Sequence, residues 1–150
     1  MESNVQIVQR AFQEFMRGNT AAVVDICSDD VTWGGFDNPG VPLAGTFKGK
    51  TGVKRFFSQV AELIDYFSFT PREYLGNGET VIVLGHNAGK VKTTGKTFDQ
   101  DWAMVFRLRE SKIYSFFNFV DTRQTAEVFQ QGFDLQRKET IPATGVKANK

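Results

Sequence analysis

The segment YSFFNFVDT, residues 114–122, is an apolar, aromatic-rich run that ends on a carboxylate, Asp121. A carboxyl group held beside apolar side chains loses hydration of its charged form and keeps its proton more tightly than in water. Such a group removes a proton next to a carbonyl and returns it elsewhere, without a cofactor. In this interpretation Asp121 is a catalytic acid or base that moves protons inside an apolar pocket.

The same carboxylate has a second interpretation, as the N-cap of a helix. In the run DTRQ, Asp121 is placed to accept a backbone N–H two or three residues on, while Gln124 reaches back to the cap. Capping favours the charged carboxylate and requires no chemistry. The sequence leaves both interpretations open, and with them the choice between an enzyme and a non-catalytic ligand-binding or dimerisation module.

Helices are indicated where apolar residues recur at intervals of three and four. In the first, Val5, Val8 and Phe12 share one face, and Ser3 followed by Gln6 forms a capping box. The strongest apolar stripe lies in TGVKRFFSQVAELIDY. The sequence predicts helices over residues 4–17, 20–27, 51–66 and 122–132.

From Phe69 onward the apolar period changes to two, which is typical of strands joined by short polar turns. Strands are predicted over residues 31–33, 68–75, 80–92, 97–109 and 112–121. The order is helix, helix, strand, helix, then an antiparallel meander closed by a helix. We therefore expect an α+β fold with the helices gathered on one face of a curved sheet.

The turn at residues 110–111 sets the pairing of the last two strands. A two-residue loop there places Phe117 opposite Met104 and Asp121 opposite Gln100, and paired residues project from the same face. That face is an apolar floor with a few polar groups, as in a small-ligand pocket. With Trp33 at the rim of a Gly/Pro loop, the predicted substrate-binding residues are Trp33, Asn87, Gln100, Trp102, Met104, Phe117 and Phe119.

The opposite face of the sheet is also predicted to be apolar. A two-residue turn at residues 94–95 places Trp102 opposite Asn87 and turns His86, Asp99 and Asp101 away from the pocket. A three-residue turn would instead bring His86 inward as a general base, and the sequence leaves this open. A face this apolar needs a cover, so we expect a homodimer through the outer sheet face. Its predicted residues are Ile82, Leu84, His86, Ala103, Val105, Tyr114, Phe116, Asn118 and Val120.

Composition excludes several classes of function. The chain has 18 basic and 17 acidic residues and a net charge of +1, which gives no footprint for nucleic acid or an anionic membrane. Its apolar runs fall short of a membrane span, and its first residues do not resemble a secretory signal. The single cysteine, Cys27, excludes an internal disulfide and favours a reducing cytoplasm. With one histidine and no Cys/His cluster, we expect no metal and no cofactor.

Two segments resemble a known family. TGKTFDQDWAMVFRLRESKIYSFFNFVDT resembles the C-terminal half of SnoaL-like proteins, the ketosteroid-isomerase-like branch of the nuclear-transport-factor-two-like superfamily. The shared features are a Thr-Gly turn, a W-x-x-V-F-x-x-R strand, and an aromatic strand that ends in Asp. PLAGTFKGKTGVKRFF resembles the family's Gly-rich loop and third helix. The resemblance covers residues 4–130, and it places a SnoaL-like domain over residues 1–132, followed by a polar tail, 133–150.

The resemblance implies a cone-shaped, cystatin-like fold, in which a curved mixed or antiparallel sheet and the helices on its concave face enclose a pocket. In the family's cyclases and epoxide hydrolases, an Asp at the position of Asp121 serves as acid or base. The resemblance therefore implies a cofactor-independent isomerase, cyclase or lyase that uses Asp121 on a small, apolar, oxygenated substrate. The Arg and second Asp of the epoxide hydrolases are replaced here by Gly85 and Asn87, which disfavours epoxide hydrolysis. The Tyr common two positions before the strand-end Asp is Phe119. The histidine of the cyclases has no secure counterpart.

Overall fold

The structure is a computed structural model and describes residues 2–130. The tail predicted over residues 133–150 and the predicted domain end at 132 lie outside the described residues. Four helices and six strands follow one another along the described part of the chain. They are α1 (Asn4–Met16), α2 (Thr20–Ile26), β1 (Cys27–Gly35), β2 (Thr46–Lys48), α3 (Gly49–Leu63), β3 (Ile64–Asn77), β4 (Thr80–Val91), β5 (Thr97–Arg109), β6 (Lys112–Phe119) and α4 (Thr122–Phe129).

The first helix begins at the predicted capping box. The Ser3 hydroxyl accepts a hydrogen bond from the Gln6 amide at 3.1 Å, and the Gln6 side chain accepts one from the Ser3 amide at 2.8 Å. These bonds satisfy backbone donors that the first turn leaves free. The third helix ends at Leu63, earlier than predicted, because Ile64 pairs with Val91 and starts β3.

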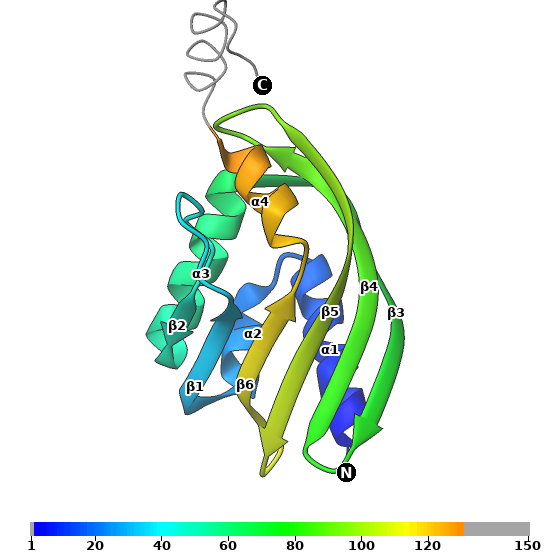
Figure 1. Ribbon diagram of the computed structural model, residues 1–150. Coiled ribbons are helices and arrows are strands. Elements are labelled where there is room, and N and C mark those ends of the chain that lie inside the picture. The colour runs from blue at the N-terminus through cyan, green and yellow to red at the C-terminus, as the bar shows by residue number, and fades with distance from the viewer. Residues whose placement is uncertain (1, 131–150) are drawn as a thin grey trace, which may run out of the picture.

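The strands form one mixed sheet in the order β2-β1-β6-β5-β4-β3. The β1–β6 pair is parallel and the other pairs are antiparallel. In Figure 1, α1 and α2 lie behind the curved sheet, α3 runs beside β1 and β2, and α4 lies near one end of the sheet. The predicted α+β arrangement is confirmed, with helices and sheet enclosing an interior. No helix within residues 2–130 is long and apolar enough to cross a membrane.

The β4–β5 connection is longer than predicted, yet it leaves the faces of both strands as expected. Lys90 pairs with Thr97, so the connection is not a two-residue turn. Trp102 therefore lies opposite Gly85, where the sequence predicted Asn87. The pairing has moved by two residues, and since side chains alternate with a period of two, each side chain keeps its face.

The β5–β6 pairing differs from the predicted one, and the difference changes which β6 side chains face the interior. The two-residue turn is confirmed by the pair Arg109 and Lys112, but a bulge follows, because Leu108 pairs with Ile113 while Arg107 pairs with Ser115. One extra residue in β6 reverses the face of every later side chain. Met104 therefore lies opposite Asn118, where Phe117 was expected. The predicted faces of four β6 residues were wrong: Phe116 and Asn118 belong to the inner face, and Phe117 and Phe119 to the outer face.

Buried side chains form two separate hydrophobic clusters. The larger, here the inner cluster, joins α1, α2 and the central strands, and includes Ile7, Phe12, Val31, Trp33, Trp102, Met104, Phe106, Leu108, Ile113 and Phe116. The smaller, here the end cluster, joins α4 to α3 and the ends of β3–β5, and consists of Val41, Val60, Ile64, Val91, Phe98, Val128 and Phe129. Cys27 is fully buried in the inner cluster, and this burial raises the pKa of its thiol to about 12.

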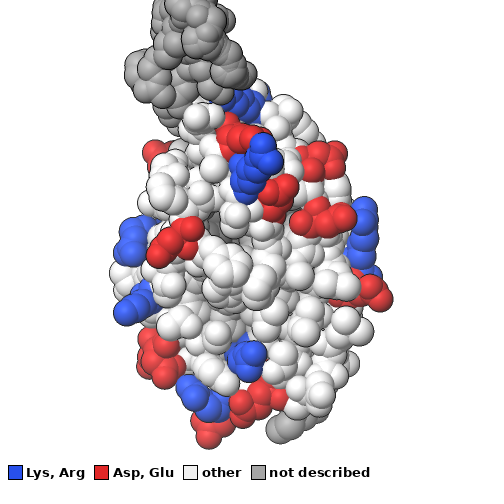
Figure 2. Space-filling model, viewed as in Figure 1, with Lys and Arg blue, Asp and Glu red and all other residues white. Residues whose placement is uncertain are grey.

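The outer face of β4–β6 remains partly exposed and apolar. It carries Ile82, Leu84, Ala103, Val105, Phe117 and Phe119. Phe119 is 44% exposed, and Phe36, which packs edge-on against Phe117, is 51% exposed. Figure 2 shows a broad area without charged side chains over β1, β6 and β5, with most charges around its margin.

Candidate functional site

A cavity of about 180 Å³ is lined by residues of both hydrophobic clusters. Its walls come from α1, α2, α3, the inner face of the sheet, the loop between β1 and β2, and α4. The loop is tied to α4 by a hydrogen bond of 2.9 Å from the Asn38 side chain to the Thr122 carbonyl oxygen. Thr94 adds a bond of 2.6 Å from its hydroxyl to the Val128 carbonyl oxygen, which joins α4 to the sheet. The cavity wall therefore includes parts of the chain that are far apart in sequence.

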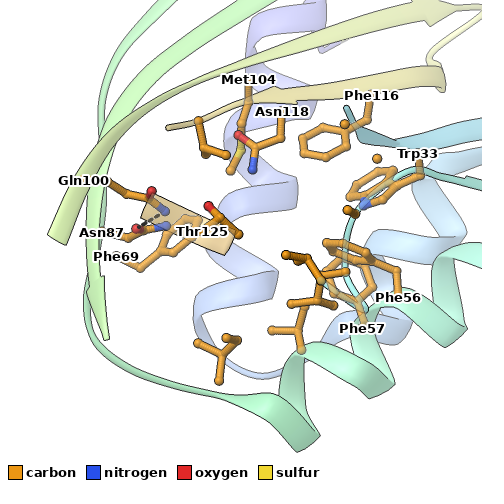
Figure 3. Close-up of a pocket in the computed structure, with 18 of the residues that line it drawn as sticks. Trp33, Phe56, Phe57, Phe69, Asn87, Gln100, Met104, Phe116, Asn118 and Thr125 are labelled. Carbon is orange, nitrogen blue, oxygen red and sulfur yellow. Dashed lines mark hydrogen bonds between the residues drawn. The ribbon is translucent and has the colours of Figure 1, made fainter. Parts of the chain in front are cut away.

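Three neutral amides from adjacent strands line the cavity (Figure 3). Asn87 of β4 pairs with Gln100 of β5, and the Gln100 amide nitrogen donates to the Asn87 side-chain oxygen at 3.2 Å. Asn118 comes from β6, opposite Met104. Figure 3 shows the Asn87–Gln100 pair on one side of the cavity and Trp33 with Phe116 on the other.

Three buried polar atoms of the lining side chains have no hydrogen-bond partner among the described residues. They are Trp33 Nε1, Gln100 Oε1 and Asn118 Oδ1, called the unpaired cavity atoms below. An unsatisfied buried polar atom costs about 1–3 kcal/mol, so native proteins leave few of them. The cavity around these three atoms is therefore the candidate functional site.

The cavity wall carries no charged side chain from the described part of the chain. Among the described lining residues, Tyr66 alone has a titratable side chain, and burial raises the pKa of its phenol to about 12. The phenol is therefore neutral over the whole physiological range. The remaining lining side chains are mostly aromatic or aliphatic.

Aromatic rings give one wall of the cavity a flat surface. The indole of Trp33 stacks on Phe116 with ring centroids 4.2 Å apart and planes at 26°. Phe57 meets the same indole edge-on at 5.6 Å. Trp33 lies in β1, within the strand predicted over residues 31–33, but it is only 4% exposed and so is buried, where a position at the rim of the loop was expected.

The structure places four of the predicted substrate-binding residues in the cavity wall: Trp33, Asn87, Gln100 and Met104. Trp102 faces the helices as expected, but it stacks on Phe12 at 5.8 Å and does not line the cavity. Phe117 and Phe119 lie on the outer face because of the β6 bulge. Their predicted place is taken by Phe116 and Asn118.

Asp121 lies outside the cavity, as the N-cap of α4. Its Oδ1 accepts from the backbone amides of Arg123 and Gln124, both at 3.1 Å, and its side chain is exposed. Asp121 does not pair with Gln100 as the sequence predicted, because β6 ends at Phe119 and the bulge has changed the register. This geometry matches the capping interpretation of Asp121, although Gln124 bonds the Asp99 amide at 3.0 Å and does not reach back to the cap.

His86 lies on the outer face, as the two-residue alternation predicts. Its Nε2 is 2.7 Å from Asp99 Oδ1, and its Nδ1 is 2.8 Å from Asp101 Oδ1. Both aspartates were expected on that face, and both side chains are largely exposed. His86 does not line the cavity.

Among the lining residues that the sequence analysis missed, Asn118 matters most for the site, because its Oδ1 is one of the unpaired cavity atoms. The run SFFNF contains adjacent aromatic residues, Phe116 and Phe117, so alternation alone does not identify the inner face. The signal available was Asn118 itself, a polar residue in an otherwise aromatic strand. Sequence reasoning also missed lining residues from α1, α3 and β3, such as Phe15, Phe56 and Phe69. Those missed in the loop and α4 include Asn38, Val41, Leu43, Thr125, Val128 and Phe129.

The curved mixed sheet and helices α1–α3 enclose an apolar cavity, and α4 completes its wall. This arrangement defines a cone-shaped α+β domain of the NTF2-like, or cystatin-like, class. The SnoaL-like domain family matches residues 8–116, and the chain belongs to this family. The predicted resemblance to SnoaL-like proteins is thereby confirmed.

Solved structures agree with this assignment. An NTF2-like protein from Burkholderia xenovorans LB400 is 31% identical, with a TM-score of 0.77, over 85% of this chain and 95% of that chain. One from Burkholderia thailandensis E264 is 30% identical, with a TM-score of 0.78, over 87% and 99%. TerC, co-crystallised with polyporic acid, shares the fold at 22% identity and a TM-score of 0.74, over 84% and 97%. No curated protein sequence matches this chain.

Proposed function

We propose that this protein binds a small, largely apolar, oxygenated molecule in the cavity between the sheet and its helices. The observation that carries the proposal is the set of unpaired cavity atoms in an otherwise apolar wall. A ligand with oxygen functions satisfies these atoms, and its apolar body replaces water against the aromatic side chains.

The size of the cavity limits the ligand. An apolar cavity of about 150 Å³ accepts benzene, so a cavity of about 180 Å³ suits a single substituted ring or a body of similar size. The co-crystallisation of TerC with polyporic acid supports small-molecule binding by a protein of the same fold. Acid–base catalysis by Asp121 is not part of the proposal, because its carboxyl lies outside the cavity wall.

The proposal is tested by thermal shift against a library of uncharged, oxygenated ring compounds. Native protein is compared with Asn118→Leu, which removes one unpaired cavity atom, and with Asp121→Asn, which leaves the cavity wall unchanged. We expect hits with the native protein and with Asp121→Asn, and weaker shifts with Asn118→Leu. If no compound raises the melting temperature of the native protein, or if the hits bind equally to all three proteins, the proposed site is wrong.

We also infer that two copies of the chain pair through the outer face of β4–β6. Exposed aromatic side chains on a sheet face favour association, and Phe36, just past the end of β1, packs on Phe119 and extends the apolar area beyond the strands. A Val105→Lys variant places a charge at the centre of this face and is expected to sediment as a monomer, whereas native protein sediments as a dimer. A native monomer at micromolar concentration would overturn the inference.

A further inference from the structure

We propose that the cavity selects the un-ionised form of a hydroxylated ring compound that carries a hydrogen-bond acceptor at its far end, and that it rejects the corresponding anion. In this arrangement the ligand hydroxyl donates to Gln100 Oε1, and the acceptor receives the indole N–H of Trp33. The inference rests on the proposed function, since it specifies the ligand of the same cavity.

The requirement for a hydroxyl donor follows from the bonding of the Gln100 amide. Its nitrogen donates to Asn87 Oδ1 at 3.2 Å, and its oxygen is the atom without a partner among the described residues. A carbonyl oxygen accepts and does not donate, so its partner must carry a hydrogen. A hydroxyl provides that hydrogen, whereas a phenolate or carboxylate oxygen would face Gln100 Oε1 with lone pairs on both sides.

The requirement for an acceptor follows from Trp33. An indole nitrogen is a donor only, and Trp33 Nε1 is buried without a partner in residues 2–130. Figure 3 shows Trp33 and Gln100 on opposite sides of the cavity, so the ligand carries its acceptor and its donor at opposite ends. The stacked rings of Trp33 and Phe116 provide a flat aromatic wall that favours a flat ring between these ends.

Electrostatics reject the anion independently. No Lys, Arg or His within the described chain lines the cavity, so an anion there has no cation to pair with. A buried charge without a partner is strongly disfavoured against its neutral form. The carboxylates of Asp99 and Asp101 flank Gln100 on the opposite face, where they are largely exposed and contact His86. At the loop and α4, the side chains of Asp37, Asp121, Arg123 and Glu127 are exposed.

Inside the cavity formed by residues 2–130, the group that titrates in the test is the ligand, because Tyr66, whose pKa is about 12, keeps its proton throughout the range used. 4-Nitrophenol is a suitable probe because it is a flat ring with a hydroxyl and an acceptor at opposite ends, and it ionises near neutral pH. Its affinity for native protein is measured by calorimetry at pH values below and above its own pKa. We expect the dissociation constant to rise about tenfold for each pH unit above that pKa, as only the neutral form binds.

Two further probes separate the possible failures. 4-Nitroanisole has the same ring and acceptor but lacks the hydroxyl hydrogen, and 4-nitrobenzoate is an anion at every working pH. We expect weaker binding of 4-nitroanisole than of neutral 4-nitrophenol, and no binding of 4-nitrobenzoate. If none of the three binds, the proposed function itself fails at this site. If 4-nitrophenol binds but its affinity is independent of pH, or if 4-nitrobenzoate binds as well, the proposed function stands and this inference is wrong.

Two substitutions test which residue binds each end of the ligand. Gln100→Leu is expected to weaken 4-nitrophenol about tenfold and to leave 4-nitroanisole unchanged, because the lost acceptor serves the hydroxyl alone. Trp33→Phe keeps an aromatic ring and is expected to weaken both probes, since both present the nitro group. Asp121→Asn serves as the control with unchanged affinities. Equal weakening of both probes by Gln100→Leu would overturn the assignment of Gln100 as the hydroxyl acceptor.

Discussion

Asn118→Leu is the substitution that separates the stability of this protein from its binding. Asn118 Oδ1 is buried and has no partner within residues 2–130, and its side chain lies in the cavity wall beside Met104 (Figure 3). Leucine has a similar branched shape but no polar atom. The substitution therefore removes an unsatisfied group and leaves the packing of β6 nearly unchanged.

The magnitude follows from the burial of that one oxygen. An unsatisfied buried polar atom costs about 1–3 kcal/mol, and part of that penalty is recovered when the atom is replaced by an apolar one. We expect the free energy of unfolding without ligand to rise by about 1 kcal/mol. A hydrogen bond to a ligand contributes about 0.5–1.5 kcal/mol, so binding through Asn118 should weaken by about threefold to tenfold.

The assay is urea denaturation of the native and variant proteins, with and without a saturating ligand from the thermal-shift screen. Asn38→Leu is the matched control, because Asn38 also lines the cavity but donates to the Thr122 carbonyl oxygen at 2.9 Å. That variant should lose about 1 kcal/mol, the opposite sign to Asn118→Leu, since it removes a hydrogen bond that ties the β1–β2 loop to α4. Destabilisation by Asn118→Leu with an unchanged denaturant slope would refute the reasoning, because it would mean that the amide is satisfied in the free protein.

Three further outcomes are expected. Gly34→Ala should lower the free energy of unfolding by about 3 kcal/mol, because its new Cβ would collide with the carbonyl oxygen of Gly45. Gly40→Ala, at φ +82 in open space, should lower it by only about 1 kcal/mol, and equal losses in urea denaturation would contradict this difference. Asp121→Ala should lower the free energy of unfolding by about 1 kcal/mol by removing the cap of α4, and Asp121→Asn should cost little, as chemical denaturation will measure. Burial raises the pKa of Tyr66 from 10.0 to about 12, so the stability held by the neutral phenol is complete below pH 10 and about 2 kcal/mol is lost as the pH rises toward 12. Denaturation curves of Tyr66→Phe across this range should lack that loss, and a loss equal to that of the native protein would count against a buried phenol.

Much of the architecture was predictable from local patterns. The capping box at Ser3, the change of apolar period after α3 and the turn between β5 and β6 are features of neighbouring residues, and each appears in the structure at or close to its predicted place. The cavity faces of β4 and β5 were also predicted, although their connecting loop is longer than expected. An error of two residues in pairing does not exchange the faces of a strand.

The register of β6 could not be predicted from local sequence patterns. Its bulge between Ile113 and Ser115 has no marker in the sequence, because a bulge is set by how a strand twists between its two neighbours. Here those neighbours are β5 on one side and the parallel strand β1 on the other, and β1 lies far away in the chain. The amino-acid order thus determined the helices, the strands and an apolar pocket floor. The folded sheet determined that Asn118 enters the cavity and that Asp121 caps a helix, because a shift of one residue reverses a strand and only long-range pairing sets that shift.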